Sequence, residues 1–186
     1  MDDRELRAQL ETCHAESYGW AMACCRRDQI DAETVLQTVY LKVLQGKARF
    51  DGRASFKTWL FAVIRNTAAD ERRRSVFRRF GLARVEEAAT RAQREESPDE
   101  TVYRSEIQLQ FREALARLPG RQREVLQLVF YHDLTLSEAA AVMNVSIGSA
   151  RTHYERGKKT LRRLMAESRV FDESGFGREE NREAVP

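Results

Sequence analysis

The chain has 186 residues, with 32 Lys and Arg against 29 Asp and Glu, and 42% of its residues are hydrophobic. These values describe a highly charged protein of one or two small domains. No window approaches the roughly 20 consecutive apolar residues of a membrane-spanning helix, and the N-terminus is acidic where a secretory signal is basic. We therefore expect no membrane insertion and a cytoplasmic location.

Three cysteines, Cys13, Cys24 and Cys25, are an odd number and form no C-x-x-C pair. This pattern argues against a disulfide framework, and we expect no metal and no cofactor. Cys13 and Cys24 lie on an apolar helical stripe and are interpreted as core residues, with a redox role as the alternative. The sequence shows no nucleophile and base pair and no glycine-rich phosphate loop, so an enzyme is the least favoured class.

Charge is unevenly distributed along the chain. Residues 1–85 and 109–169 carry more basic than acidic side chains, whereas residues 86–108 and 170–186 carry more acidic ones. Such segregation suggests two modules that face a polyanion, separated and followed by segments that do not. The alternative is that the charge blocks are only solvated helix faces.

Apolar residues at helical spacing predict three helices in residues 1–80. The first runs from about residue 3 to 26, and the second has Asp31 as its N-cap and stops near Gly46. The third follows Ser55 as its cap and ends in the arginines that finish at Arg74. Three such helices can form a small bundle.

The apolar stripe disappears between residues 81 and 106, which indicates a flexible linker. Residues 107–169 then predict a second helical module, with helices that end near Leu118 and His132 and a close pair of helices after them. Residues 170–186 are polar and acidic, and we expect a disordered tail. The expected fold class is all-α, with two small helical domains joined by the linker.

The close pair of helices, residues 136–143 and 147–165, has the features of a helix-turn-helix. Asn144 can adopt the left-handed conformation of a tight turn, and Ser146 can cap the next helix. A recognition helix carries short polar residues and cations near its N-terminus, for base edges and phosphates. The candidates here are Ser149, Arg151, Thr152, His153, Arg156 and Lys158. The alternative is an ordinary amphipathic pair with a charged outer face.

The stretch from Phe50 to Arg74 interleaves aromatic residues with Lys, Arg and Asn. Single-stranded nucleic acid favours this mixture, because bases stack on rings while cations follow the backbone. Phe56 and Trp59 lie on the expected buried stripe and are interpreted as core residues. Phe50, in the preceding loop, is the better candidate for contacting a base.

Two stretches together resemble a known family. Asp31-Ala32-Glu33 with Gln37 and Leu41, followed by residues 50–74, resembles the second conserved region of the extracytoplasmic-function sigma factors of bacteria. Residues 115–164, with Leu118-Pro119 and the segment from Ser146 to Arg151, resemble their fourth conserved region. The chain departs from the usual family pattern at Thr34, Thr38 and His153.

The resemblance implies an alternative sigma factor that binds core RNA polymerase and directs promoter recognition, DNA melting and transcription initiation. Asp31, Glu33, Gln37 and Leu41 would contact the polymerase. In the melted −10 element, Phe50 and Asn66 would line a pocket for a flipped base, and Arg65, Arg72, Arg73 and Arg74 would hold the strand. The recognition-helix candidates would read the −35 element.

The resemblance also implies an anti-sigma factor as a partner, besides core polymerase and promoter DNA in duplex and single-stranded form. Two other functions stay open. One is a sigma-like decoy or adaptor that sequesters an anti-sigma factor, although a decoy has no need for the arginine-rich helix end. The other is a helix-turn-helix regulator that binds duplex DNA, which leaves the first module unexplained.

Overall fold

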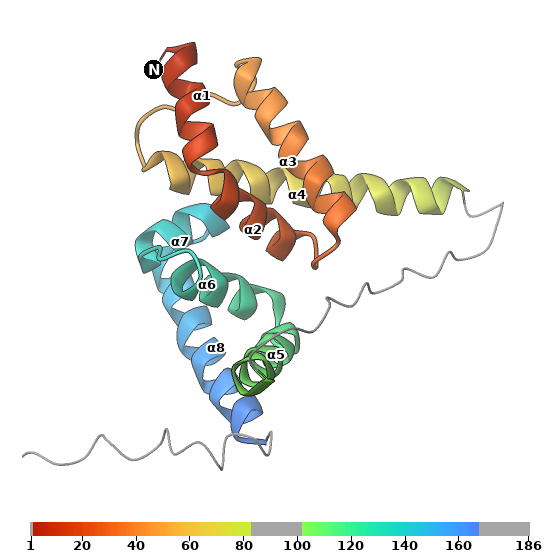
Figure 1. Ribbon diagram of the computed structural model, residues 1–186, viewed down its shortest axis with the longest axis vertical. Coiled ribbons are helices and arrows are strands. Elements are labelled where there is room, and N and C mark those ends of the chain that lie inside the picture. Colours follow the sequence, from red (N-terminus) through yellow and green to blue (C-terminus); the bar gives the residue numbers. More distant parts are fainter. Residues whose placement is uncertain (1, 83–101, 168–186) are drawn as a thin grey trace, which may run out of the picture.

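The computed structural model describes residues 2–82 and 102–167. These residues form eight α-helices and no strand, which confirms the all-α fold (Figure 1). Among the described helices, none combines the length and the apolar character needed to cross a bilayer. The predicted linker lies largely, and the predicted tail wholly, outside the described residues.

The first module contains helices α1 to α4, and its beginning differs from the prediction of one helix over residues 3–26. Two helices are found, α1 (Asp3–Thr12) and α2 (His14–Cys24), and the chain bends at the buried Cys13. A straight helix of that length would extend about 36 Å. The bend lets α1 pack against α3 while α2 packs against both α3 and α4.

Helix α3 (Gln29–Leu44) begins earlier than predicted, because its N-cap is Asp28 and not Asp31. The Asp28 carboxylate accepts a hydrogen bond from the Asp31 backbone N–H at 2.9 Å. An acceptor at this position satisfies one of the donors that the first turn of a helix leaves unpaired.

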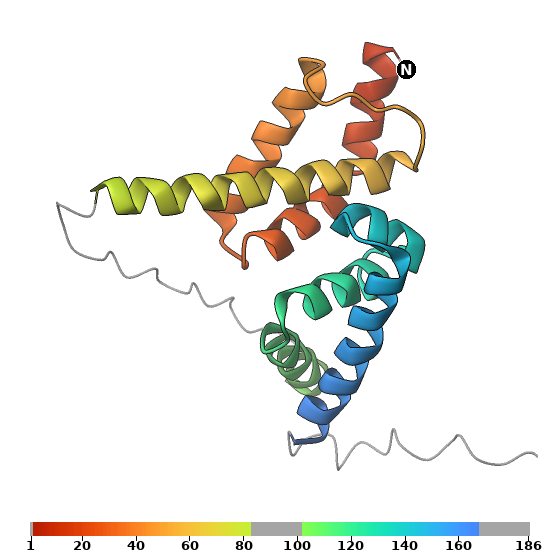
Figure 2. The same ribbon diagram turned by 180° about the vertical axis from the view of Figure 1, so that it is seen from behind.

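Helix α4 (Phe56–Leu82) continues well past Arg74, where the sequence suggested an end. Its expected cap is confirmed, since the Thr58 N–H donates to the Ser55 hydroxyl at 3.2 Å. Ion pairs one turn apart, Asp70 with Arg73 and Glu71 with Arg74, support the part that lacks an apolar stripe. Both views show the C-terminal part of α4 projecting beyond the helical bundle (Figure 2).

The second module contains α5 (Val102–Ala116), α6 (Gly120–Phe130), α7 (Leu136–Met143) and α8 (Ile147–Glu167). The predicted helix-turn-helix is confirmed at the level of its caps. Asn144 is left-handed, with φ 52° and ψ 53°, and the Ser149 N–H donates to the Ser146 hydroxyl at 3.1 Å. Thr135 and Glu138 form a capping box that starts α7.

The sequence did not predict that the two modules pack against each other. Helix α7 lies against α4, and α6 lies below α2 in Figure 1. One continuous cluster of buried side chains crosses the boundary. It includes Trp20, Leu60, Phe61 and Ile64 from the first module and Leu128, Leu134, Ala139, Val142 and Met143 from the second.

Candidate nucleic-acid interface

The first half of α8 presents most of the recognition candidates to solvent. Ser149, Arg151, Thr152 and Arg156 are exposed, whereas His153 and Lys158 are half-buried. The Thr152 hydroxyl donates to the Gly148 carbonyl at 3.0 Å, and the Ser149 hydroxyl lies 2.9 Å from that of Ser146. Two arginines on a well-capped helix are therefore available to a ligand, while the short polar side chains line its first turns.

The opposite face of α8 fixes the helix to its module. Ala150, Gly157, Leu161 and Leu164 are buried as predicted, but Ile147, expected on the same side, is 51% exposed. A Cβ atom on Gly157 would lie 3.1 Å from Leu126 Cδ1, so α6 and α8 cross closely at this glycine. Ile147 escapes burial because it is the first residue of the helix, beyond this crossing.

The half-buried Lys158 lies over an aromatic ring and also pairs with Glu155 at 3.1 Å. Its ammonium group lies 4.5 Å from the ring centre of Tyr154, and Tyr154 stacks on Phe130 at 6.0 Å. A cation above a ring face is attracted to the π electrons. The charge of Lys158 is thus held on one side of α8.

Phe50 is part of a half-buried aromatic cluster at the start of α4. Its ring centre lies 5.5 Å from that of Phe56 and 5.4 Å from that of Trp59, and the last two rings are 5.3 Å apart. Phe56 and Trp59 are themselves only partly buried. The loop residue and the two expected core residues therefore form one surface that offers ring edges and faces to a base.

Further along α4, the residues predicted to bind the DNA strand differ in solvent exposure and in ion pairing. Asn66 and Arg72 are exposed, and so are Arg73 and Arg74, whose ion pairs with acidic neighbours leave most of each side chain in solvent. Arg65 differs, because its guanidinium pairs with Glu124 of the second module, and only 16% of its side chain is exposed. The structure therefore collects this set along one helix but turns Arg65 toward the module boundary.

The four residues predicted to contact the polymerase lie on one helix, α3, and all of them are exposed. They are Asp31, Glu33, Gln37 and Leu41. Ile30 is 77% exposed and Leu41 57%, and Leu44 is also exposed. The sequence reasoning missed Ile30 and Leu44, although their spacing from Leu41 was available as a signal. Apolar side chains that gather in solvent on one helix face are a mark of a surface that binds a protein.

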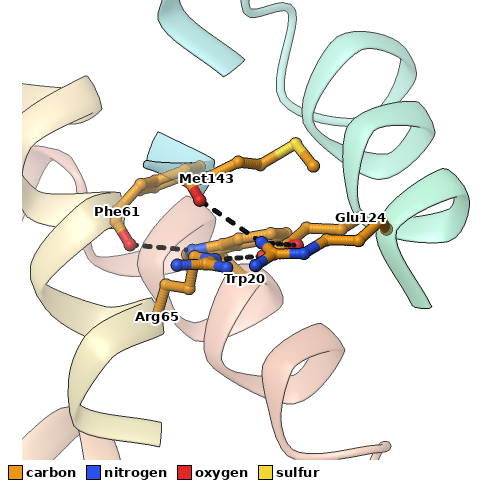
Figure 3. A network of polar contacts seen from close by, with 6 residues as sticks. Trp20, Phe61, Arg65, Glu124 and Met143 are labelled. Carbon is orange, nitrogen blue, oxygen red and sulfur yellow. Dashed lines mark hydrogen bonds and ion pairs between the residues drawn. The ribbon is translucent and has the colours of Figure 1, made fainter. Parts of the chain in front are cut away.

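Three aromatic side chains meet at the boundary between the modules. Trp20 stacks on Phe61 at 5.7 Å, and the His132 ring contacts both edge-on, at 5.6 Å and 4.9 Å. The Trp20 indole N–H donates to the Phe61 carbonyl at 3.0 Å (Figure 3). Burial, reinforced by Lys57 nearby, lowers the pKa of His132 to about 4. His132 is therefore neutral at neutral pH.

A network of polar contacts surrounds Glu124 at the same boundary. One carboxylate oxygen pairs with Arg65, and the other accepts from Arg121 at 3.2 Å. Arg121 also donates to the carbonyl of Met143 at 3.3 Å, which ties α6 to the end of α7 (Figure 3). Only 17% of the Glu124 side chain is exposed, so this is a largely desolvated ion pair.

A second carboxylate joins the N-termini of α4 and α7. Glu138 accepts from the Thr135 N–H at 2.9 Å and from the Thr58 hydroxyl of the first module at 3.2 Å. Hydrogen bonds from Thr135 and then Thr58 lower the pKa of Glu138. A negative charge there is favourable to both helices, because the N-terminus of a helix carries partial positive charge.

Comparison with known proteins assigns each module to a family. Residues 11–78 match the family model "Sigma-70 region 2", and residues 108–161 match "Sigma-70, region 4". The ECF RNA polymerase sigma factor SigX of Bacillus subtilis is 30% identical over 157 residues, which cover 83% of this chain and 80% of SigX. SigW of the same organism is 24% identical over 143 residues, 73% of this chain and 75% of SigW.

Two solved structures have a similar fold. The sigma factor RpoE from Bartonella quintana, in complex with the anti-sigma factor NepR, matches with a TM-score of 0.67 and 19% identity, over 89% of this chain and 99% of RpoE. CnrH, in complex with the cytosolic domain of CnrY, matches with a TM-score of 0.61 and 20% identity, over 90% of this chain and 91% of CnrH.

Proposed function

We propose a division of labour between the two modules of this chain, which belongs to the ECF sigma factors of bacterial RNA polymerase. It is an alternative sigma factor that binds core RNA polymerase and directs promoter recognition and transcription initiation. The relatives are sigma factors and not enzymes, and we assign no catalytic role to the chain. Its proposed place of action is the cytoplasm, on the nucleoid when it is bound to polymerase.

The second module, proposed to span residues 107–169, reads the −35 element. The observation that carries this assignment is the exposed first half of α8, with Arg151 and Arg156 in solvent on a helix that the Ser146 cap and the Gly157 crossing hold rigidly. A rigid scaffold keeps base-contacting side chains at fixed spacing along the major groove. Arginine is well suited there, because its planar fork can bond two acceptors on guanine.

The first module, proposed to span residues 1–80, captures the melted −10 element. The Phe50 cluster offers rings to an extruded base, and the exposed Asn66 amide adds a donor and an acceptor along the same helix. Arg72, Arg73 and Arg74 lie further along and supply positive charge for the phosphates. Preference for the unpaired strand then contributes to melting, because a ligand shifts an equilibrium by its difference in affinity.

The exposed face of α3, with Asp31, Glu33, Gln37 and Leu41, is the proposed polymerase contact. The exposed Ile30 and Leu44 extend it with apolar surface. A regulatory anti-sigma factor is the proposed third partner, by analogy with the complexes of RpoE and CnrH. Residues 81–106 are proposed as the linker between the modules and residues 170–186 as an acidic tail.

A crossed experiment tests the division of labour. Holoenzymes with Arg151→Ala or Asn66→Ala are bound to two templates, a duplex with only the −35 element and a forked template with only a single-stranded −10 element. Arg151→Ala should weaken duplex binding by about 1–3 kcal/mol, the range for a bidentate base contact, and leave the fork unaffected. Asn66→Ala should do the reverse. Arg162→Ala, an exposed arginine further along α8, is the control. Equal losses on both templates would contradict the assignment.

A further inference from the structure

Ile147 is a large apolar side chain that lies in solvent at the front of the recognition helix. It is the first residue of α8, and it is 51% exposed. A single exposed apolar residue is ordinary on a protein surface, so its meaning depends on its neighbours. Arg151 is also exposed and lies one turn further along, and residues four positions apart share a helix face. Ile147 therefore belongs to the face that is proposed to enter the major groove.

The hydroxyl groups on the same turns are already engaged within the protein. The Thr152 hydroxyl donates its only proton to a backbone carbonyl one turn back, at 3.0 Å. The Ser149 and Ser146 hydroxyls lie 2.9 Å apart, so one of their two protons is used between them. A hydroxyl whose proton is used can only accept from a base. Among the exposed side chains of the first two turns, this leaves the Arg151 guanidinium to donate to a base and the Ile147 methyl groups as the largest apolar surface.

The major groove offers one apolar group to such a side chain, the C5-methyl group of thymine. The other groups on the base edges are hydrogen-bond donors and acceptors, which would lose water to an aliphatic side chain without gaining a bond. The first turn of α8 carries no acidic residue, so no carboxylate in that turn opposes the approach of a phosphate. Ile147 therefore fits a thymine better than any other base.

We infer that Ile147 selects a thymine in the −35 element, through contact between its methyl groups and the C5-methyl group of that base. This inference rests on the proposed role of α8 in reading the −35 element. It gives a role in specificity to a side chain that the sequence reasoning placed on the buried face of the helix. The contact removes apolar surface of both partners from water, and one buried methyl group corresponds to about a fourfold change in affinity.

The test uses the holoenzyme and a duplex with the −35 element of a promoter that the holoenzyme transcribes. Deoxyuridine replaces each thymine of the element in turn, which removes only the C5-methyl group. We expect one of these replacements to weaken binding of the wild type about three- to fivefold. Ile147→Ala should weaken binding to the unmodified duplex by at least the same factor. The variant should not respond to that replacement, because each change removes one side of the same contact.

Leu109→Ala is the matched control, because this leucine of α5 is 53% exposed. It should keep both the wild-type affinity and the wild-type response to deoxyuridine. The inference is overturned if the −35 element contains no thymine, or if the wild type responds at none of its thymines. It is also overturned if Ile147→Ala keeps the full response, since another side chain then contacts the methyl group. An equal loss of affinity with Leu109→Ala would have the same consequence.

A duplex with a scrambled −35 element separates this inference from the proposed function. If the wild-type holoenzyme binds both duplexes equally, the proposed reading by α8 fails and the inference with it. If the holoenzyme prefers the −35 element and Arg151→Ala weakens that preference, but deoxyuridine has no effect, only the inference fails. Ile147→Val, which shortens the side chain by one carbon, carries the test if Ile147→Ala does not fold. Its response to deoxyuridine must then be smaller than that of the wild type, and an equal response overturns the inference.

Discussion

Phe50 and Asn66 share a proposed task but differ in their surroundings, so their substitutions should differ. Phe50→Ala removes two ring contacts and is expected to lower the free energy of unfolding by about 1–2 kcal/mol. Asn66→Ala, at an exposed helical position, should change it by less than about 0.5 kcal/mol. Both should impair promoter opening, which permanganate footprinting of the melted region measures, while polymerase affinity is retained.

Urea unfolding of the two variants provides the control. If Asn66→Ala opens promoters normally, the flipped-base assignment is wrong for that residue. If it unfolds as readily as Phe50→Ala, Asn66 has a structural role instead.

Substitution of Leu41 tests whether the exposed face of α3 binds the polymerase. Leu41→Asp places a charge where an apolar side chain would be buried in the complex, and we expect at least a tenfold loss of polymerase affinity, equivalent to about 1.4 kcal/mol. Leu109→Asp is a matched control, because this leucine of α5 is similarly exposed. Fluorescence anisotropy measures the affinity of each variant for core polymerase. Equal losses of affinity for the two variants would contradict the proposal that α3 contacts the polymerase.

At the scale of elements, the crossing of α6 and α8 depends on a single missing side chain. Gly157→Ala would bring a Cβ within 3.1 Å of Leu126 Cδ1 and 3.3 Å of the Gln122 carbonyl oxygen. Overpacking of this kind costs about 1–3 kcal/mol, more than the helix propensity that alanine gains. We expect a lower melting temperature and weaker duplex binding, because the recognition helix is displaced.

Gly148→Ala is the matched control on the same helix. Its Cβ would meet only the Ser146 hydroxyl at 3.9 Å, an ordinary contact, so the melting temperature should stay the same or rise. If the two substitutions have the same effect, the close crossing does not determine the position of α8.

Local signals were sufficient to predict the helix-turn-helix. Asn144 and Ser146 each have a chemistry that suits one backbone position, and the structure confirms both. The break at Cys13 was not predictable in this way, because the apolar stripe continues through it and only packing against α3 and α4 requires the bend. The end of α4 was predicted too early because ion pairs, rather than an apolar stripe, support the helix between Asp70 and Arg74, where the sequence suggested its end.

Along α4, the predicted strand-binding set was recognisable from residue types, but its surroundings were not. The burial of Phe61 and the pairing of Arg65 depend on side chains about 60 to 70 positions away, such as Glu124 and His132. A single sequence carries no periodic signal for such contacts. Contacts between modules were therefore outside the reach of the sequence reasoning.

At the scale of the whole molecule, His132 makes the packing of the modules sensitive to acid. Burial and Lys57 favour its neutral form, whereas Glu16 and Asp133 act weakly in the opposite direction. The unfolded chain protonates this histidine near its ordinary pKa of about 6.5, and the folded protein does so only near about 4. Stability should therefore fall as the pH drops from about 6.5 toward 4, by up to about 3 kcal/mol.

Urea unfolding at pH 7.5 and pH 5 measures this loss. His132→Phe keeps an aromatic ring without a titrating group, and its stability should fall less over the same interval. His14→Gln, at an exposed position, should retain the wild-type dependence. If His132→Phe loses as much stability as the wild type, protonation of His132 does not weaken the packing of the modules.

Run-off transcription with purified core RNA polymerase and a pool of genomic promoter fragments, with and without this protein, tests most directly whether the protein directs transcription initiation. We predict start sites that depend on the protein, lost with Asn66→Ala and reduced with Arg151→Ala on promoters that need the −35 element. Start sites that are the same with and without the protein would contradict the account, even if the protein binds the polymerase.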